Sequence, residues 1–108
     1  MTTYLLNTPI ITSYGEWKFE GPISTEQAKE RVLSGFESAI GHDASAQFLS
    51  RLLGIDIPMN RIAISMQAGD TALVLRIKSR LPEGKILTQE EISLIPFELG
   101  WLKKLSDS

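Results

Sequence analysis

Alternating apolar and polar residues predict strands at both ends of the chain, because alternation places successive side chains on opposite faces of a sheet. Near the N-terminus, the short apolar run Tyr4–Leu6 is typical of a buried strand. Glu16–Glu20 alternates strictly, with Trp17 and Phe19 on one face, and predicts a half-buried strand that Gly21-Pro22 ends. These two stretches predict the N-terminal part of a sheet.

The C-terminal half contains three further alternating stretches. Arg61–Met66 and Leu73–Ile77 alternate on either side of the turn residues Ala68-Gly69-Asp70, which predicts a β-hairpin. Apolar residues of one parity across Phe97–Leu105 predict that the chain ends in a strand. The sheet is therefore expected to contain about five strands.

Capping boxes predict the starts of two helices. Ser24–Gln27 opens the first, which extends to about Leu33. Its inner stripe consists of Ala28, Val32 and Leu33. Thr88–Glu91 opens a second, short helix that Pro96 closes.

Another helix is predicted from Asp43 or Ala44 to Leu53, with Gly54 at the expected C-terminal position. Asp43 is a residue type that favours the N-cap, so His42 is expected at the mouth of this helix. Backbone N–H groups point outward there, and they favour anions.

The order of these elements predicts the fold class. About five strands and about three helices follow one another in mixed order along 108 residues, the length of one typical domain. We therefore expect a single α/β (α+β) domain spanning residues 1–108, with one mixed sheet and the helices packed on it.

Composition excludes several function classes. The net charge of −2 argues against a dedicated, non-specific binder of duplex DNA. The absence of cysteine removes disulfides, thiolate zinc sites and cysteine nucleophiles, and it fits a cytoplasmic protein. The N-terminus has no signal-peptide pattern, and no apolar run approaches the roughly 20 residues of a membrane span. We therefore expect no membrane association.

His42, the single histidine, is the first candidate for chemistry, because imidazole can give or take a proton near neutral pH. The commoner role of such a residue is a surface or capping histidine. One histidine cannot supply the three or four ligands of a zinc site, so we expect no metal. A serine triad is not expected either, because the spacing of a nucleophile elbow is absent.

Positive charge is concentrated around one predicted strand. From Arg61 to Lys85 there are five basic and two acidic residues, so 5 − 2 = +3, whereas the rest has six basic and eleven acidic residues, so 6 − 11 = −5. The cations Arg76, Lys78 and Arg80 share one parity. They form either a solvated face or a phosphate-binding wall.

Glu83 lies in the predicted turn between Pro82 and Gly84, just beyond this wall. Its carboxylate is either solvated or orients Arg80, His42 or a substrate hydroxyl.

Several motifs together resemble the type III anti-CRISPR viral ring nucleases, in consistent order and over nearly the whole chain. The motifs are Tyr4-Leu5-Leu6-Asn7, Ile40-Gly41-His42-Asp43 with a helix ending Leu52-Leu53-Gly54, Asn60-Arg61, and Arg80–Thr88 continuing to Glu90-Glu91-Ile92. The second and the last are together fairly specific.

The resemblance implies a small homodimer, encoded by a virus or mobile element, that binds cyclic tetra-adenylate across its dimer interface. Such proteins cleave this second messenger of type III CRISPR defence without a metal or another cofactor and leave 2′,3′-cyclic phosphate ends. RNA carries its own nucleophile, the 2′-hydroxyl, so the protein needs only positioning, charge stabilisation and a proton donor.

The resemblance also implies roles for individual residues. His42 corresponds to the general acid, Arg80 would stabilise the scissile phosphate, and Glu83 would hold the geometry of the site. The ligand-binding candidates are Asn7, Gly41, Arg61 and Arg76.

The chain departs from the family pattern at Thr8–Gly15, where Thr12 or Ser13 could replace a missing pocket hydroxyl. Two alternatives stay open. One is a non-catalytic module of a mobile element that binds a cyclic nucleotide or a partner protein. The other is a structural or interaction domain whose basic strand is only a solvated face.

Overall fold

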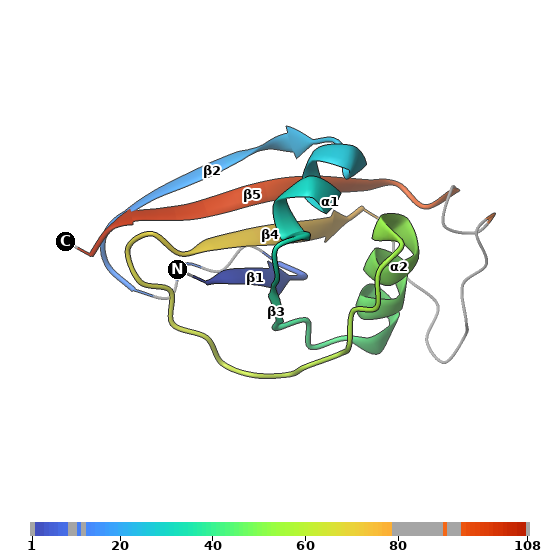
Figure 1. Ribbon diagram of the computed structural model, residues 1–108, viewed down its shortest axis with the longest axis horizontal. Coiled ribbons are helices and arrows are strands. Elements are labelled where there is room, and N and C mark those ends of the chain that lie inside the picture. The colour runs from blue at the N-terminus through green and yellow to red at the C-terminus, as the bar shows by residue number, and fades with distance from the viewer. Residues whose placement is uncertain (1, 9–10, 12, 79–89, 91–93, 108) are drawn as a thin grey trace.

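A single mixed sheet forms the centre of the computed structural model, which describes residues 2–8, 11, 13–78, 90 and 94–107 (Figure 1). Its five strands lie in the order β2-β5-β4-β1-β3. They are β1 (Thr3–Leu6), β2 (Glu16–Ile23), β3 (Glu37–Ser38), β4 (Thr71–Ile77) and β5 (Phe97–Ser106). β1 pairs in parallel with β3 and β4, whereas β5 is antiparallel to β4 and β2.

Two helices, α1 (Thr25–Val32) and α2 (Asp43–Leu53), belong to the described residues and contribute to one apolar cluster with the sheet. Ala28 of α1 and Phe48 of α2 are fully buried there against strand residues such as Leu5 and Leu73. The single domain with a mixed sheet and packed helices confirms the predicted fold class. Neither helix has the length and apolar character that a membrane span needs.

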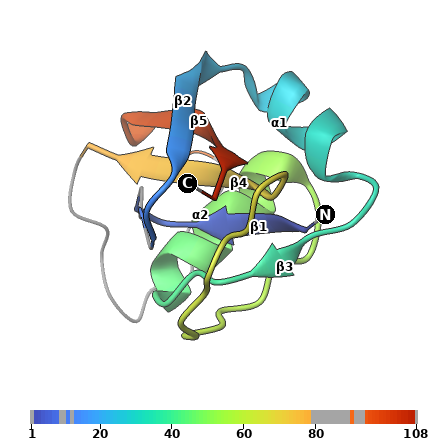
Figure 2. The ribbon, with the colours of Figure 1, turned by 90° about the vertical axis from the view of Figure 1, so that its left-hand side faces the viewer.

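The opposite face of the sheet carries no helix among the described residues. Its cluster includes Leu6, Val74 and Leu102, and the segment before β4 covers part of it with Met66 and Ile64. The sheet therefore has a helix face and a helix-free face. Figure 2 views the sheet from one end and shows β1 between β3 and β4.

The predicted hairpin is wrong. Residues 61–66 form no strand, and β4 pairs instead with β5 and β1. The alternating pattern suggested a strand because Ile64 and Met66 do pack on the sheet. They do so, however, from a segment that lies across the face of the sheet. β4 is a central strand and is buried on both faces, with Leu73 and Val74 fully covered.

The predicted β1 and β5 are confirmed, and β2 extends further than expected. Instead of ending at Gly21-Pro22, β2 continues to Ile23 after an irregularity in its pairing with β5. Proline is tolerated there because β2 is an edge strand, whose outer N–H groups need no partner strand.

The predicted start of α1 is confirmed in detail. Ser24 is the N-cap, its side chain accepts from the Gln27 amide, and Gln27 bonds back to the Ser24 amide, as a capping box requires. Leu33, however, is 65% exposed and does not join the inner stripe, because α1 ends one residue earlier. Most of the predicted helix after Thr88 lies outside the described residues.

Lys104 is a buried cation that joins three parts of the chain at the far end of β5. Its ammonium group donates to Ser13 Oγ at 2.6 Å and to the Met66 carbonyl at 3.2 Å. It also lies 3.0 Å from Asp107 Oδ1 and 5.4 Å from the centre of the Trp17 ring. Because the side chain is only 4% exposed, these partners replace the hydrogen bonds to water that the ammonium group loses on burial.

Replacing Lys104 with methionine should destabilise the fold. The apolar volume is kept, but the Met66 carbonyl loses a donor in a buried place, which costs about 1–3 kcal/mol. Urea denaturation measures the loss. The matched control is Lys103→Met on the same strand, which should stay close to wild type; equal stability of both variants would contradict this role for Lys104.

Candidate functional site

The carboxyl ends of β1, β3 and β4 meet at one end of the sheet, because β1 runs parallel to both neighbours. The register is fixed by Leu5, which lies opposite Ser38 on one side and Leu73 on the other. In Figure 1 the arrowheads of β1 and β4 point toward the end where α2 lies. In open sheets with parallel strands, ligands usually bind beyond such ends.

Residues from the predicted site follow these strands. Asn7 comes directly after β1, Gly41 and His42 follow β3, and Arg76 lies in the last part of β4. We call Asn7, Gly41, His42 and Arg61 the carboxyl-end site.

His42 is itself the N-cap of α2, with extended backbone angles of φ −125° and ψ 125°. Its exposed imidazole makes no capping hydrogen bond. The prediction that Asp43 caps the helix is wrong: Asp43 is the first helical residue, and its carboxylate accepts from Gln47 Nε2 at 2.8 Å. The imidazole is thus displayed at the helix start rather than used to build it.

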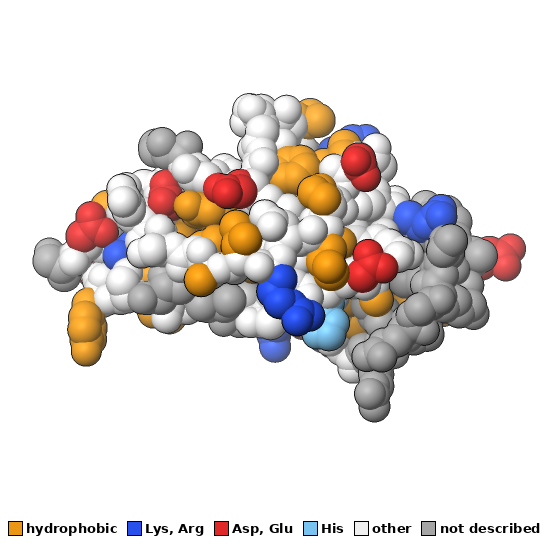
Figure 3. All heavy atoms as spheres, turned by 90° about the horizontal axis from the view of Figure 1, so that it is seen from below, with side chains coloured by type: hydrophobic (Ala, Val, Ile, Leu, Met, Phe, Trp, Pro, Cys, Tyr) orange, Lys and Arg blue, Asp and Glu red, His pale blue; other side chains and the backbone are white. Residues whose placement is uncertain are grey.

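Two hydrogen bonds hold the Arg61 side chain beside His42, and both are made to the carbonyl of the peptide group that precedes His42. The Arg61 Nε and Nη2 atoms donate to the Gly41 carbonyl at 3.1 and 2.9 Å. A Cβ on Gly41 would lie 3.4 Å from Arg61 Cγ, which is an ordinary van der Waals contact and shows how closely the arginine side chain packs on this peptide group. A guanidinium has five N–H donors, so donors remain for an anionic ligand. Figure 3 shows the histidine at the surface with a basic side chain beside it.

Asn60 and Ser38 hold the Arg61 segment against the exit of β3. Asn60 donates from Nδ2 to the Ser38 carbonyl and from its amide to the Ile40 carbonyl, both at 2.8 Å. The buried Ser38 hydroxyl donates to the Pro58 carbonyl at 2.6 Å. Sequence reasoning missed Ser38, whose only signal was a small polar residue next to the apolar pair Ala39-Ile40.

The basic row of β4 is partly neutralised. Lys78 Nζ lies 3.0 Å from Glu98 Oε1 on β5, and this contact holds the pKa of the Glu98 carboxyl below its usual range, first through the hydrogen bond and then through the charge of Lys78. Arg76 is exposed and makes no hydrogen bond or ion pair within the described residues. Arg80 and Glu83 lie outside the described residues, so the predicted wall is placed only in part.

The structure thus brings together Gly41, His42 and Arg61 and places Asn7 at the same end of the sheet. Arg76 points from β4 to the helix-free face, because it shares parity with Val74. Across the described positions, no three of the possible acidic or histidine ligands gather closely enough to hold a metal ion.

Comparisons with known proteins agree with this architecture. The family model described as STIV B116-like matches residues 3–99. The chain is 43% identical to the uncharacterized protein ORF117 of Acidianus two-tailed virus, over 94% of this chain and 92% of that protein. It is 32% identical to the uncharacterized protein YddF of Bacillus subtilis (strain 168), over 97% and 99% of the two chains.

The solved structure of B116 of Sulfolobus turreted icosahedral virus superposes with a TM-score of 0.81 at 26% identity. The match covers 95% of this chain and 99% of B116. The sheet and helices described above are therefore shared along nearly the whole length of that protein.

Stability should depend on pH through Glu98. Its folded pKa is lowered, so its contribution is present above the unfolded pKa and is lost as pH falls through the folded pKa. We expect Glu98→Gln to be less stable than wild type at pH 7, and the difference to vanish in acid. Thermal unfolding across this range measures it, with the exposed Glu37→Gln as control; a difference that is independent of pH would contradict the assignment.

Proposed function

Since the chain belongs to the STIV B116-like family, we propose that it is a metal-independent ring nuclease that binds and cleaves cyclic tetra-adenylate and so counters type III CRISPR signalling. The observation that carries the proposal is the pairing of an exposed histidine with an anchored arginine at the carboxyl-end site. The motif resemblance also supports the proposal, and so does the occurrence of similar proteins in viruses.

The reaction we propose uses the ligand's own nucleophile. A ribose 2′-hydroxyl loses its proton to water as its oxygen attacks the adjacent phosphorus, the bond to the 5′-oxygen breaks, and a 2′,3′-cyclic phosphate forms. The leaving 5′-oxygen must gain a proton, and the His42 imidazole, which carries no capping bond, is the group that donates it. The N-terminus of α2 would add a field that favours the phosphate, and the Asp43 carboxylate in its first turn would partly offset this field.

Arg61 would hold a phosphate of the ring next to this acid. Its fork to the Gly41 carbonyl fixes the guanidinium in advance, so little freedom is lost when a ligand binds. Asn7, beyond β1, would contact the ligand from the neighbouring strand end. Arg80 and Glu83, outside the described residues, keep the roles that the resemblance implies: stabilising the scissile phosphate and holding the geometry.

A homodimer would explain how one histidine per chain suffices. Cyclic tetra-adenylate is itself symmetric, so a two-fold axis through the ligand would present the same residues to opposite sides of the ring. Each chain would then supply one acid and one arginine clamp.

His42→Ala should abolish most of the cleavage. The purified protein should linearise cyclic tetra-adenylate in EDTA, and the variant should lose on the order of 10²–10⁴ in rate because the leaving oxygen has no proton donor. Single-turnover assays read by mass spectrometry measure this loss and detect the 2′,3′-cyclic phosphate. Arg51→Ala, at the other end of α2, is the control and should cleave at the wild-type rate.

An unchanged rate in His42→Ala would eliminate histidine as the acid. Tight binding by the wild-type protein with no cleavage would instead identify a non-catalytic module that sequesters a cyclic nucleotide.

Arg61→Ala should weaken binding of the ring more than it slows the chemistry. One charge-assisted contact is worth about 1.5–3 kcal/mol, which corresponds to a loss of about 10-fold to 150-fold in affinity. Arg61→Lys should restore little, since a lysine cannot make the fork to the Gly41 carbonyl. Calorimetry with cyclic tetra-adenylate measures the affinities; binding by Arg61→Ala as tight as by Arg51→Ala, which removes the same charge elsewhere, would refute the clamp.

A further inference from the structure

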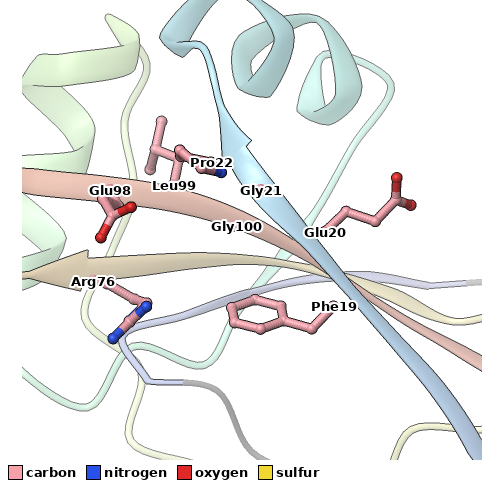
Figure 4. Close-up of a pocket in the computed structure, with 8 residues that line it drawn as sticks. All are labelled: Phe19, Glu20, Gly21, Pro22, Arg76, Glu98, Leu99 and Gly100. Carbon is pink, nitrogen blue, oxygen red and sulfur yellow. The ribbon is translucent and has the colours of Figure 1, made fainter.

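A hollow of about 140 Å³ opens between β2, β4 and β5 (Figure 4). We call it the sheet hollow, and the residues that matter for its chemistry are Phe19, Gly21, Arg76, Glu98 and Gly100. Phe19 and Arg76 belong to the helix-free face of the sheet, since Phe19 lies opposite Leu102 in the strand pairing and Arg76 shares parity with Val74. Of the ligand-binding candidates that the resemblance implies, Arg76 lines this hollow, whereas Asn7, Gly41 and Arg61 do not.

Phe19 lies over a glycine and exposes much of its ring. A Cβ on Gly100 would come within 2.5 Å of Phe19 Cε1, so the ring occupies the space that a side chain there would need. The side chain is nevertheless 46% exposed. Figure 4 shows the ring directed from β2 toward the Arg76 side chain of β4, while Glu20 points away. The hollow therefore offers an aromatic surface to the solvent.

Polar groups of opposite charge flank this surface. The exposed guanidinium of Arg76 has no hydrogen bond or ion pair to any other described residue. Glu98 lies opposite Arg76 in the strand pairing, and its contact with Lys78 is made through Oε1. The Arg76 guanidinium, which can donate hydrogen bonds, and the Glu98 carboxylate, which has a second oxygen that can accept one, thus lie beside the Phe19 ring.

This combination matches one class of ligand. A nucleobase stacks on an exposed aromatic ring, its exocyclic amino group donates to a carboxylate, and a phosphate pairs with a guanidinium. We propose that the sheet hollow is a nucleotide-binding site, in which the base stacks on Phe19, the phosphate binds Arg76 and the amino group donates to Glu98.

The sheet hollow is separate from the carboxyl-end site within one chain. Phe19 belongs to β2 and His42 follows β3, the strands at opposite edges of the sheet. Four strand spacings of about 4.8 Å place these edges roughly 19 Å apart. Nucleotide binding in the hollow therefore does not depend on cleavage at His42.

Titration of the full-length, isotope-labelled chain with adenosine 5′-monophosphate, followed by NMR, tests the proposal. Saturable shifts are expected at the amides of Gly21 and Gly100 and at the Arg76 Nε–H. Phe19→Leu should lower the affinity about tenfold or more, because stacking is lost, whereas Phe19→Tyr should keep it. Leu33→Ala, which shortens an exposed apolar side chain at the end of α1, is the matched control and should bind like wild type.

Arg76→Gln separates the phosphate contact from stacking. It should weaken binding of adenosine 5′-monophosphate but leave that of adenosine unchanged, since only the nucleotide carries the anion. The shifts at Gly21 and Gly100 report on the sheet hollow itself, so a failure of the ring-nuclease proposal leaves this result intact. Absence of shifts at Gly21 and Gly100, or equal affinity in the folded Phe19→Leu variant, would overturn the nucleotide site.

Discussion

The parallel pairing of β1 with both of its neighbours is the constraint on which the rest of the structure depends. β1 has only four residues, yet Leu5 faces the helix cluster and Leu6 faces the opposite cluster, so this short strand joins both halves of the core. Its register aligns the exits of β3 and β4 with its own. A shift by one residue would exchange Leu5 and Leu6 between the two faces and separate Asn7 from the exit of β3.

Local signals predicted the elements whose stability is local. The capping box of α1 and the glycine after α2 act within a few residues, so Ser24 and Gly54 could be assigned from sequence. The β-hairpin failed because strand partners are chosen by long-range packing. Arg61–Met66 alternates like a strand, but β5, which comes later in the chain, takes the place beside β4.

The same distinction applies to the candidate site: residues that belong to a motif could be predicted, whereas contacts that depend on the fold could not. His42, Gly41 and Arg61 could be singled out from the motif resemblance, and the structure brings them together. The contacts of Ser38 and Asn60 could not be foreseen, because they join segments about twenty residues apart through backbone carbonyls, which leave no mark on residue type. The pairing of Lys78 with Glu98 likewise requires the register of β4 against β5.

The two edges of the sheet restrict how copies of this chain can associate. β3 contains only two residues, and β2 carries Lys18 and the Gly21-Pro22 irregularity. Short, charged or proline-bearing edges are poor templates for another strand. Two copies therefore cannot readily merge into one continuous sheet, so the contact in the proposed homodimer would use side chains on a face or at an end. Such a contact can be changed by surface substitutions without disturbing the strand ladder of either copy.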